Sequence, residues 1–222
     1  MNYTGYRHDA SGTGERFLEM EIGPKAMEMI GAAEETILFP LFLFDSFYAS
    51  GVEERDMVGM VTESMLEKRA AYPDIRIAFI LDANKDSFDM EKDGTPNRQA
   101  ARYLLRKARE TGGELEFRWY STHGEQNHAK TMSITNPSAG RHWITTGSAN
   151  WTGRNLAGVN MEANVVVDGA PALNSKFNDD FDLFWTNRDG NEYSLHYDAF
   201  KDATAADAKW RRGETPFYLG TF

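Results

Sequence analysis

Hydrophobic residues along the chain follow two patterns: short, nearly unbroken runs and positions repeated at helical spacing. The runs TILFPLFLF (36–44) and IRIAFIL (75–81) predict buried strands, and the alternating segment ELEFRWY (114–120) predicts a third strand. Apolar residues at helical spacing predict helices over residues 23–35, about 54–71 and 97–111. Because continuous apolar strands that alternate with helices are typical of parallel sheets, this part of the chain predicts strand–helix–strand units.

The second half of the chain has shorter connections. HAKTMSIT (128–135) and RHWITTG (141–147) predict a hairpin joined by NPSAG, and NMEANVVVDG (160–169) predicts a further strand. A helix is expected over residues 171–185 and a short one near 199–211. With no internal repeat or linker, the sequence predicts an irregular lead-in over residues 1–19 and one α/β domain over residues 20–222. The expected architecture is a mixed, mainly parallel β-sheet sandwiched by helices.

Composition and charge limit the classes of function. The chain has 222 residues, of which 41% are hydrophobic and 13% aromatic, as expected of a folded globular protein. Its net charge of −10 disfavours broad nucleic-acid binding, which depends on neutralising phosphates, but leaves room for a local basic pocket. The absence of cysteine excludes disulfides, Cys-ligated zinc and thiol nucleophiles. No signal peptide is recognisable and no apolar run is long enough to span a bilayer, so a soluble protein is expected, with its compartment left open.

Polar side chains gather on the predicted hairpin. Side chains alternate faces along a strand, so His128 and Lys130 are expected on the same side. Ser148 and Asn150, which follow Gly147, are also two residues apart and are expected to share a side. The four would converge at one end of the sheet, where open α/β folds bind ligands. An imidazole can attack phosphorus, while an ammonium and a carboxamide can orient phosphate oxygens. Glu162 is the nearest predicted acceptor for the second nitrogen of the histidine. The alternative is an ordinary sheet edge with solvated polar residues.

The segments HAK (128–130), GSAN (147–150) and NME (160–162), in this order, resemble the HKD motif of the phospholipase D superfamily. The flanking segments DANKDSFDMEKDGTPN, RWYSTHGEQNHAK and LGTF resemble the second half of bacterial two-motif phospholipase D-like proteins. The resemblance covers residues 20–222 and implies a phospholipase D-like fold.

The resemblance also implies a mechanism that needs no metal or cofactor. His128 would be a catalytic histidine that forms a phosphohistidine, Lys130 and Asn150 would bind phosphate, Ser148 would support the pocket, and Glu162 would orient His128. The histidine of a second motif would protonate the leaving oxygen.

Two residues beside the motif, His123 and Trp151, are expected to bind substrate, against the alternative that they only shape the loop and fill the core.

The chain departs from the family pattern in two ways. Thr135 stands where the family has an aspartate five positions after the lysine. The chain also contains a single motif, since His123, His142 and His196 have no lysine two residues later. The second half-site must therefore come from a missing N-terminal half or from a second copy in a homodimer.

These features predict a phosphodiesterase that hydrolyses a phospholipid or a similar small phosphodiester. The acidic balance favours such a substrate over nucleic acid. Three alternatives remain open: a metal-independent homodimeric endonuclease of the same superfamily, a phosphatidyltransferase, and an inactive half-domain that acts as a scaffold. Thr135 and the single motif are the support for the scaffold.

The loop that starts at Asp82 resembles the start of a calcium-binding EF-hand loop, with Asn84 and Asp86 at alternate positions. Ser87 replaces the expected glycine, Asp93 replaces the expected glutamate, and the loop follows a strand. A solvated acidic loop is the favoured interpretation.

Overall fold

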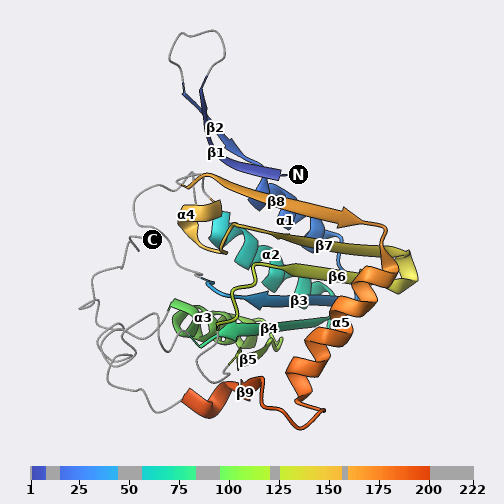
Figure 1. The fold of residues 1–222 in the computed structure, drawn as a ribbon. Helices are drawn as coiled ribbons and strands as arrows, with labels where there is room; N and C mark the ends of the chain where they lie inside the picture. Colours follow the sequence, from blue (N-terminus) through green and yellow to red (C-terminus); the bar gives the residue numbers. More distant parts are fainter. Residues whose placement is uncertain are drawn as a thin grey trace, which may run out of the picture.

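The computed structural model describes residues 2–8, 16–44, 57–83, 96–120, 126–156 and 160–200. Within these ranges the chain forms a nine-stranded sheet in the order β2-β1-β8-β7-β6-β3-β4-β5-β9, with helices on both faces (Figure 1). The strands are β1 Asn2–His8, β2 Arg16–Met20, β3 Thr36–Leu41, β4 Arg76–Asp82, β5 Glu116–Tyr120, β6 Met132–Asn136, β7 Arg141–Gly147, β8 Glu162–Asp168 and β9 Ser194–His196.

The mixed α/β architecture with helices on both faces is confirmed, but the sheet is not mainly parallel. Only β3, β4 and β5 pair in parallel, and the other pairs are antiparallel. The parallel part is where helices connect the strands, as the sequence predicts. From β6 to β8 the connections are too short for a parallel crossover, so successive strands run in opposite directions.

Five helices accompany the described part of the sheet: α1 Ile22–Gly31, α2 Met57–Ala71, α3 Pro96–Glu110, α4 Gly153–Leu156 and α5 Pro171–Thr186. Figure 1 shows α1, α2 and α3 behind the sheet and α5 in front of it. The strand residues alternate accordingly: on β3, Ile37 and Phe39 face the larger core with α1–α3, and Leu38 faces Phe181 of α5.

Three phenylalanines on neighbouring strands form the centre of the larger core. The Phe79 ring lies between those of Phe39 and Phe117, with centroids 4.6 and 4.5 Å away and nearly parallel planes. Aromatic pairs opposite one another on adjacent strands stabilise both the pairing and its register. This stack fixes the parallel strands whose carboxyl ends carry the candidate site.

The ends of the chain differ from the prediction. The lead-in predicted to be irregular contains β1 and β2, and β1 pairs with β8. The sequence prediction missed β9, and the 3₁₀ turn Tyr197–Phe200 follows it. The helix predicted near 199–211 lies largely outside the described residues.

Candidate active site

The site is built around residues 42–44, which continue from the carboxyl end of β3. The Phe42 backbone N–H donates to the Ala129 carbonyl at 2.7 Å, beside a bridge between Leu41 and Lys130. One residue later, the Leu43 carbonyl accepts from the Trp151 N–H at 3.1 Å. One short segment therefore joins the histidine–lysine part of the motif to its Ser-Ala-Asn part.

Asn97, in the first turn of α3, holds this segment in place. Its side chain is fully buried and accepts from the Phe44 N–H at 2.7 Å. The same amide donates to the carbonyls of Phe42 at 2.7 Å and Asp82 at 2.8 Å. Asn97 thus ties together the ends of β3 and β4 at the edge where the motif residues lie.

A second asparagine, Asn127, positions the histidine. Its N–H donates to Oδ2 of Asp82 at 2.6 Å, and its side-chain amide donates to the Ile80 carbonyl at 3.1 Å. The side-chain oxygen then accepts from the Ala129 N–H at 3.2 Å. These contacts clamp both sides of His128, whose exposed ring lies 4.6 Å from the Phe42 ring.

His128 and Lys130 precede β6 rather than lying within it, because the strand begins at Met132. Lys130 is only 7% exposed, and its ammonium donates to the His128 carbonyl at 2.9 Å. Its nitrogen lies 5.1 Å from the centroid of the Phe42 ring. Contacts to the His128 carbonyl and to the Phe42 ring, rather than the alternation of side chains along a strand, therefore bring the two motif side chains together.

The charges of the site influence one another. The partial burial of His128 lowers its pKa although the side chain is exposed at the surface, the positive charge of Lys130 lowers it further, and the carboxylate of Asp82 opposes both effects. Burial also lowers the pKa of Lys130, while Glu162 opposes this change. A lowered pKa keeps more of the imidazole in the neutral form that a nucleophile requires.

Glu162 does not make the predicted contact with His128. One of its oxygens accepts from the Ser148 hydroxyl at 2.5 Å, and the other accepts from the Asn155 side-chain amide. The Ser148 oxygen also accepts from the Ala163 N–H at 3.1 Å. Ser148 and Glu162 thus form one polar unit between the end of β7 and the start of β8, and the carboxylate that acts on the pKa of His128 is Asp82.

Asn150 and Trp151 have different environments. The side-chain oxygen of Asn150 is buried without a hydrogen-bond partner among the described residues, a costly state that a ligand group can relieve. Trp151, predicted to bind substrate, is 2% exposed and packs edge-on against Phe39 with centroids 5.2 Å apart. It is therefore a core residue. His123, the other predicted substrate-binding residue, lies outside the described residues.

Thr135 belongs to a separate network between β6 and α5. Its hydroxyl donates to the Asn174 side chain at 2.5 Å and accepts from the Asn178 amide at 2.8 Å. Asn174 in turn donates to the Ser133 hydroxyl at 2.8 Å. The residue that replaces the motif aspartate therefore joins the sheet to α5.

Asp82, Asn97, Asn127, Asn155 and Phe42 were not predicted as site residues. Asp82 is the last residue of the buried strand β4, and an acidic residue directly after an apolar run was an available signal for the carboxyl edge of a parallel sheet. The others are recognised only through contacts between residues distant in sequence.

The described ranges contain no cluster of three or more His, Cys, Asp or Glu side chains that could hold a metal ion. They also contain no helix with the length and apolarity needed to cross a membrane.

Comparisons with known proteins bear on the fold and the family of the chain. A search of curated proteins gives no match. Among solved structures, the chain is similar to Nuc, a phospholipase D family member from Salmonella typhimurium, with a TM-score of 0.51 and 16% identity over 87% of this chain and 95% of that one. It is similar to NucT from Helicobacter pylori, with a TM-score of 0.52 and 12% identity over 78% and 89% of the two chains.

A third similar structure is the phosphatidylserine synthase of Haemophilus influenzae Rd KW20, with a TM-score of 0.54 and 12% identity. That match covers 94% of this chain but 45% of the synthase. At these identities the structures show a shared fold. The family model described as "Cardiolipin synthase, PLD-like domain" matches residues 27–185, which is more than half of the sequence, so the chain belongs to the PLD-like domain family of the phospholipase D superfamily.

Proposed function

We propose that this protein is a phosphodiesterase that uses His128 as its nucleophile. The observation that carries the proposal is the joining of His128 and Lys130 to the Ser148–Asn150 segment through residues 42–44. The nucleophile and candidate phosphate-binding groups thereby share one edge of the sheet. The lowered pKa of His128, caused first by burial and then by Lys130, favours the reactive form.

The reaction has two steps. In the first, a neutral imidazole nitrogen of His128 attacks phosphorus, and the bond from phosphorus to the leaving oxygen breaks. That oxygen takes a proton from a second histidine. In the second step this histidine removes a proton from water, the water oxygen attacks the phosphohistidine, and the monoester leaves with His128 restored.

Lys130 and Asn150 are assigned to the phosphate oxygens. The Lys130 ammonium is held beside the histidine by the His128 carbonyl, so its charge acts close to the reacting phosphorus. The Asn150 side-chain amide is the second group, because its N–H donors can bind phosphate oxygens, whereas its buried oxygen, which lacks a partner among the residues described, can only accept. Ser148 and Glu162 are positioning residues that fix the turn between β7 and β8.

We assign the second histidine to another copy of the chain, so that the two His128 side chains act as nucleophile and acid in one site. The similarity to Nuc and NucT over 95% and 89% of their lengths supports this assignment over a second motif within a longer chain. A homodimer would place two equivalent histidines about a twofold axis.

The test is hydrolysis of bis(4-nitrophenyl) phosphate in EDTA by wild type, His128→Ala and His196→Ala. His196 is an exposed histidine on β9 and serves as the matched control. We expect His128→Ala to lose about 1,000-fold or more of the activity, since removal of a nucleophile is among the most damaging substitutions. His196→Ala should stay within threefold of wild type. Equal activity in all three proteins would refute the assignment.

Mixed dimers test the source of the second histidine. If two chains share one site, co-refolding wild type with His128→Ala should make activity fall as the square of the wild-type fraction. A linear fall would show that each chain acts alone.

A further inference from the structure

Two opposite charges, Lys130 and Glu162, are buried at the active edge without forming an ion pair. The Lys130 ammonium donates to the His128 carbonyl, and the Glu162 carboxylate accepts from Ser148 and Asn155. Neither charge pairs with an opposite charge among the residues that the structure describes. Opposite charges attract strongly in a weakly polar interior, so this separation requires contacts that hold the two groups apart.

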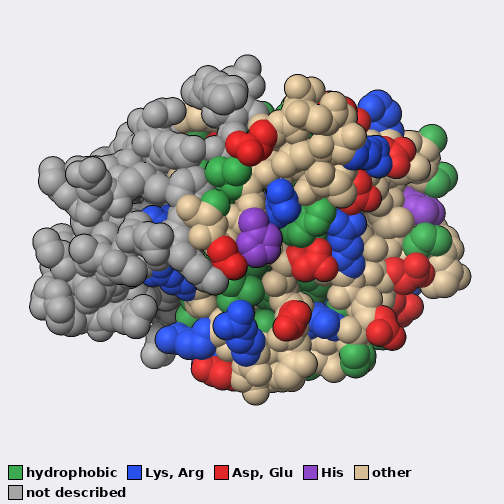
Figure 2. Space-filling model, turned by 90° about the horizontal axis from the view of Figure 1, so that it is seen from below, with side chains coloured by type: hydrophobic (Ala, Val, Ile, Leu, Met, Phe, Trp, Pro, Cys, Tyr) green, Lys and Arg blue, Asp and Glu red, His purple; other side chains and the backbone are tan. Residues whose placement is uncertain are grey.

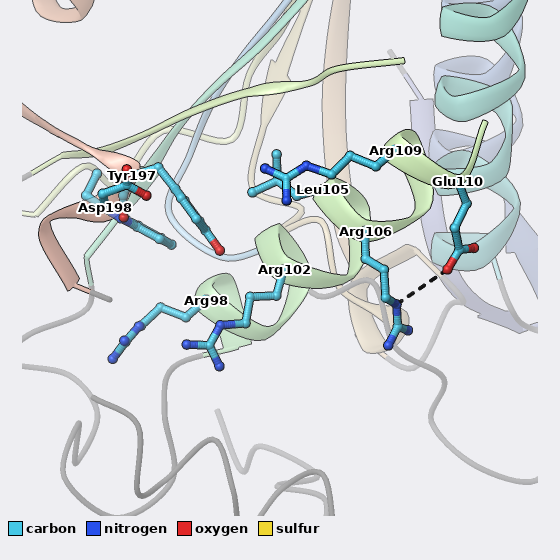
Figure 3. Close-up of a pocket in the computed structure, with 9 residues that line it drawn as sticks. Arg98, Arg102, Leu105, Arg106, Arg109, Glu110, Tyr197 and Asp198 are labelled. Carbon is cyan, nitrogen blue, oxygen red and sulfur yellow. Dashed lines mark hydrogen bonds and ion pairs between the residues drawn. The ribbon is translucent and has the colours of Figure 1, made fainter. Parts of the chain in front are cut away.

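Charges outside the active edge pair directly. Lys25 lies 2.8 Å from Glu28, and Lys107 lies 2.9 Å from Glu110. Figure 3 shows Glu110 joined also to Arg106, beside a cavity along α3. Figure 2 shows further Lys and Arg side chains next to Asp and Glu side chains on the face seen from below. The separation of the two charges at the active edge is therefore a local feature rather than a general property of the chain.

Asn155, in the short helix α4, holds one oxygen of the carboxylate. This buried side chain donates to Glu162 through its amide nitrogen and accepts from the Thr152 hydroxyl at 2.6 Å through its oxygen. A carboxylate can only accept hydrogen bonds, so the amide nitrogen must face Glu162 and the amide oxygen must face Thr152. The orientation of the Asn155 amide is thus fixed from both sides.

Ser148 holds the other oxygen of the carboxylate. Its hydroxyl donates to Glu162 at 2.5 Å, and its own oxygen accepts from the Ala163 N–H at 3.1 Å. Both oxygens of Glu162 are therefore restrained by uncharged donors, one from the segment after β7 and one from α4. The negative charge is kept in place without contact to a positive one.

This separation leaves donors of Lys130 available to a ligand. An ammonium has three N–H donors, and the printed sequence of contacts around Lys130 uses one of them, to the His128 carbonyl at 2.9 Å. A carboxylate in direct contact would occupy a further donor and neutralise the charge that attracts phosphate. Glu162 acts through space instead: burial lowers the pKa of Lys130, and the charge of Glu162 raises it.

We propose that Asn155 is a positioning residue that, together with Ser148, holds Glu162 away from Lys130. The carboxylate then balances the buried ammonium through space, while the ammonium keeps its donors for the phosphate of the substrate. The inference rests on the proposed function, because it takes Lys130 as a phosphate-binding residue. It gives a role in the reaction to Asn155 and to Thr152, which lie outside the motif segments.

The first readout is the pKa of Lys130, measured by NMR on protein that contains ¹³C-labelled lysine, with Lys130→Met to assign the signal. Glu162→Gln removes the balancing charge and should lower this pKa. Asn155→Ala releases one oxygen of Glu162, lets the carboxylate approach the ammonium and should raise the pKa. His128 and Asp82, the other titratable groups described at this edge, are unchanged in both variants.

Three further variants separate positioning from folding. Asn174→Ala removes a buried amide between β6 and α5 and should destabilise the protein without moving the pKa of Lys130. Asp168→Asn removes an exposed carboxylate at the other end of β8 and should also leave it unchanged. Thr152→Val removes the hydroxyl that orients Asn155 and should raise the pKa, so it replaces Asn155→Ala if that protein does not fold.

A general loss of stability cannot produce pKa shifts of opposite sign. Shifts of the same sign in Glu162→Gln and Asn155→Ala would overturn the proposal, and so would the absence of a shift in either variant.

The second readout is hydrolysis of bis(4-nitrophenyl) phosphate. In Asn155→Ala the released carboxylate competes with phosphate for Lys130, so KM should rise about 10-fold or more while kcat changes less than about threefold. In Glu162→Gln the decline of kcat/KM with rising pH should begin at a lower pH, because Lys130 loses its proton earlier. An unchanged KM in the first variant and an unchanged pH profile in the second would overturn the proposal.

Failure of the proposed function gives a different result. Opposite pKa shifts without hydrolysis by wild type would refute the phosphodiesterase and leave the arrangement of charges established. Hydrolysis by wild type with the same pKa of Lys130 in every variant would refute the role of Asn155 and leave the nucleophile in place.

Discussion

Replacing Asn97 by alanine tests whether one buried amide holds the active edge together. The substitution removes three hydrogen bonds of 2.7, 2.7 and 2.8 Å and leaves the Phe44 N–H and the carbonyls of Phe42 and Asp82 without this partner. An unpaired buried polar group costs about 1–3 kcal/mol, and water entering the space offsets part of this. We therefore expect a loss of about 3–6 kcal/mol in the free energy of unfolding.

The measurement is urea denaturation with the slope m compared between proteins, together with the hydrolysis assay. At this chain length the loss corresponds to a fall in Tm of about 6–24 °C. Activity should fall as well under conditions where the variant is folded, because residues 42–44 join the two parts of the motif. Asn191→Ala removes an exposed amide and should change stability by less than about 0.5 kcal/mol. An Asn97→Ala protein within 1 kcal/mol of wild type would refute the reasoning, since the three groups would then be satisfied without the amide.

Three further outcomes are expected. Gly147→Ala should destabilise the protein by about 2–3 kcal/mol or more and reduce hydrolysis. A Cβ atom there would overlap the Ala163 carbonyl and the Asn164 side chain, while Gly31→Ala meets nothing within 4 Å and should be neutral in both assays. Thr135→Val should cost about 1–3 kcal/mol in urea denaturation, because the amides of Asn174 and Asn178 lose their shared hydroxyl, whereas Thr186→Val at an exposed site should cost little. In an NMR titration, Lys130→Met should raise the pKa of His128 by removing a positive neighbour, and Asp82→Asn should lower it further; shifts of the opposite sign would contradict the assigned causes.

The hydrophobic pattern predicted the central layers of the fold well. β3 and β4 coincide with the two continuous apolar runs, and α1, α2, α3 and α5 lie within a few residues of the predicted helices. These elements are buried against one another, so the pattern of hydrophobic residues in each one directly reflects which of its faces is buried. The sequence of a strand of five to seven residues does not reveal which other strand pairs with it. The position of β6 between β3 and β7, which makes the sheet largely antiparallel, was therefore not available from the pattern.

The sheet edges were the least predictable part. β1 and β2 pair with each other, and β1 also pairs with β8, but their sequences NYTGYRH and RFLEM contain no continuous apolar run. Edge strands are held mainly by backbone hydrogen bonds to a neighbour that is distant in sequence. β9 has only three residues, and its pairing with β5 depends on the turn that follows α5.

The motif predicted which residues lie at the site but not how they are arranged. His128 and Lys130 precede β6 rather than lying within it, and both lie beside the Phe42 ring, where Asn127 and Phe42 hold them instead of the alternation along a strand. The contact predicted between Glu162 and His128 is replaced by contacts to Ser148 and Asn155. Such contacts join the loops that follow different strands. The residue pattern within one segment does not predict them.

The active edge is supported mainly by asparagine amides, which has a consequence for its charge. Asn97, Asn127 and Asn155 satisfy backbone and side-chain groups around the motif. An amide donates and accepts without carrying charge, so these contacts leave the pKa of His128 to burial, Lys130 and Asp82. An Asn127→Asp substitution would add a carboxylate beside the histidine, raise its pKa and reduce the neutral fraction near pH 6. The Asn127→Asp substitution keeps the shape of the side chain but adds a charge, so it should slow the attack on phosphorus more than the neutral Asn127→Ser substitution does. The rate of diester hydrolysis measured against pH distinguishes the two variants. Equal losses with unshifted pH profiles would show that the amides act through geometry alone.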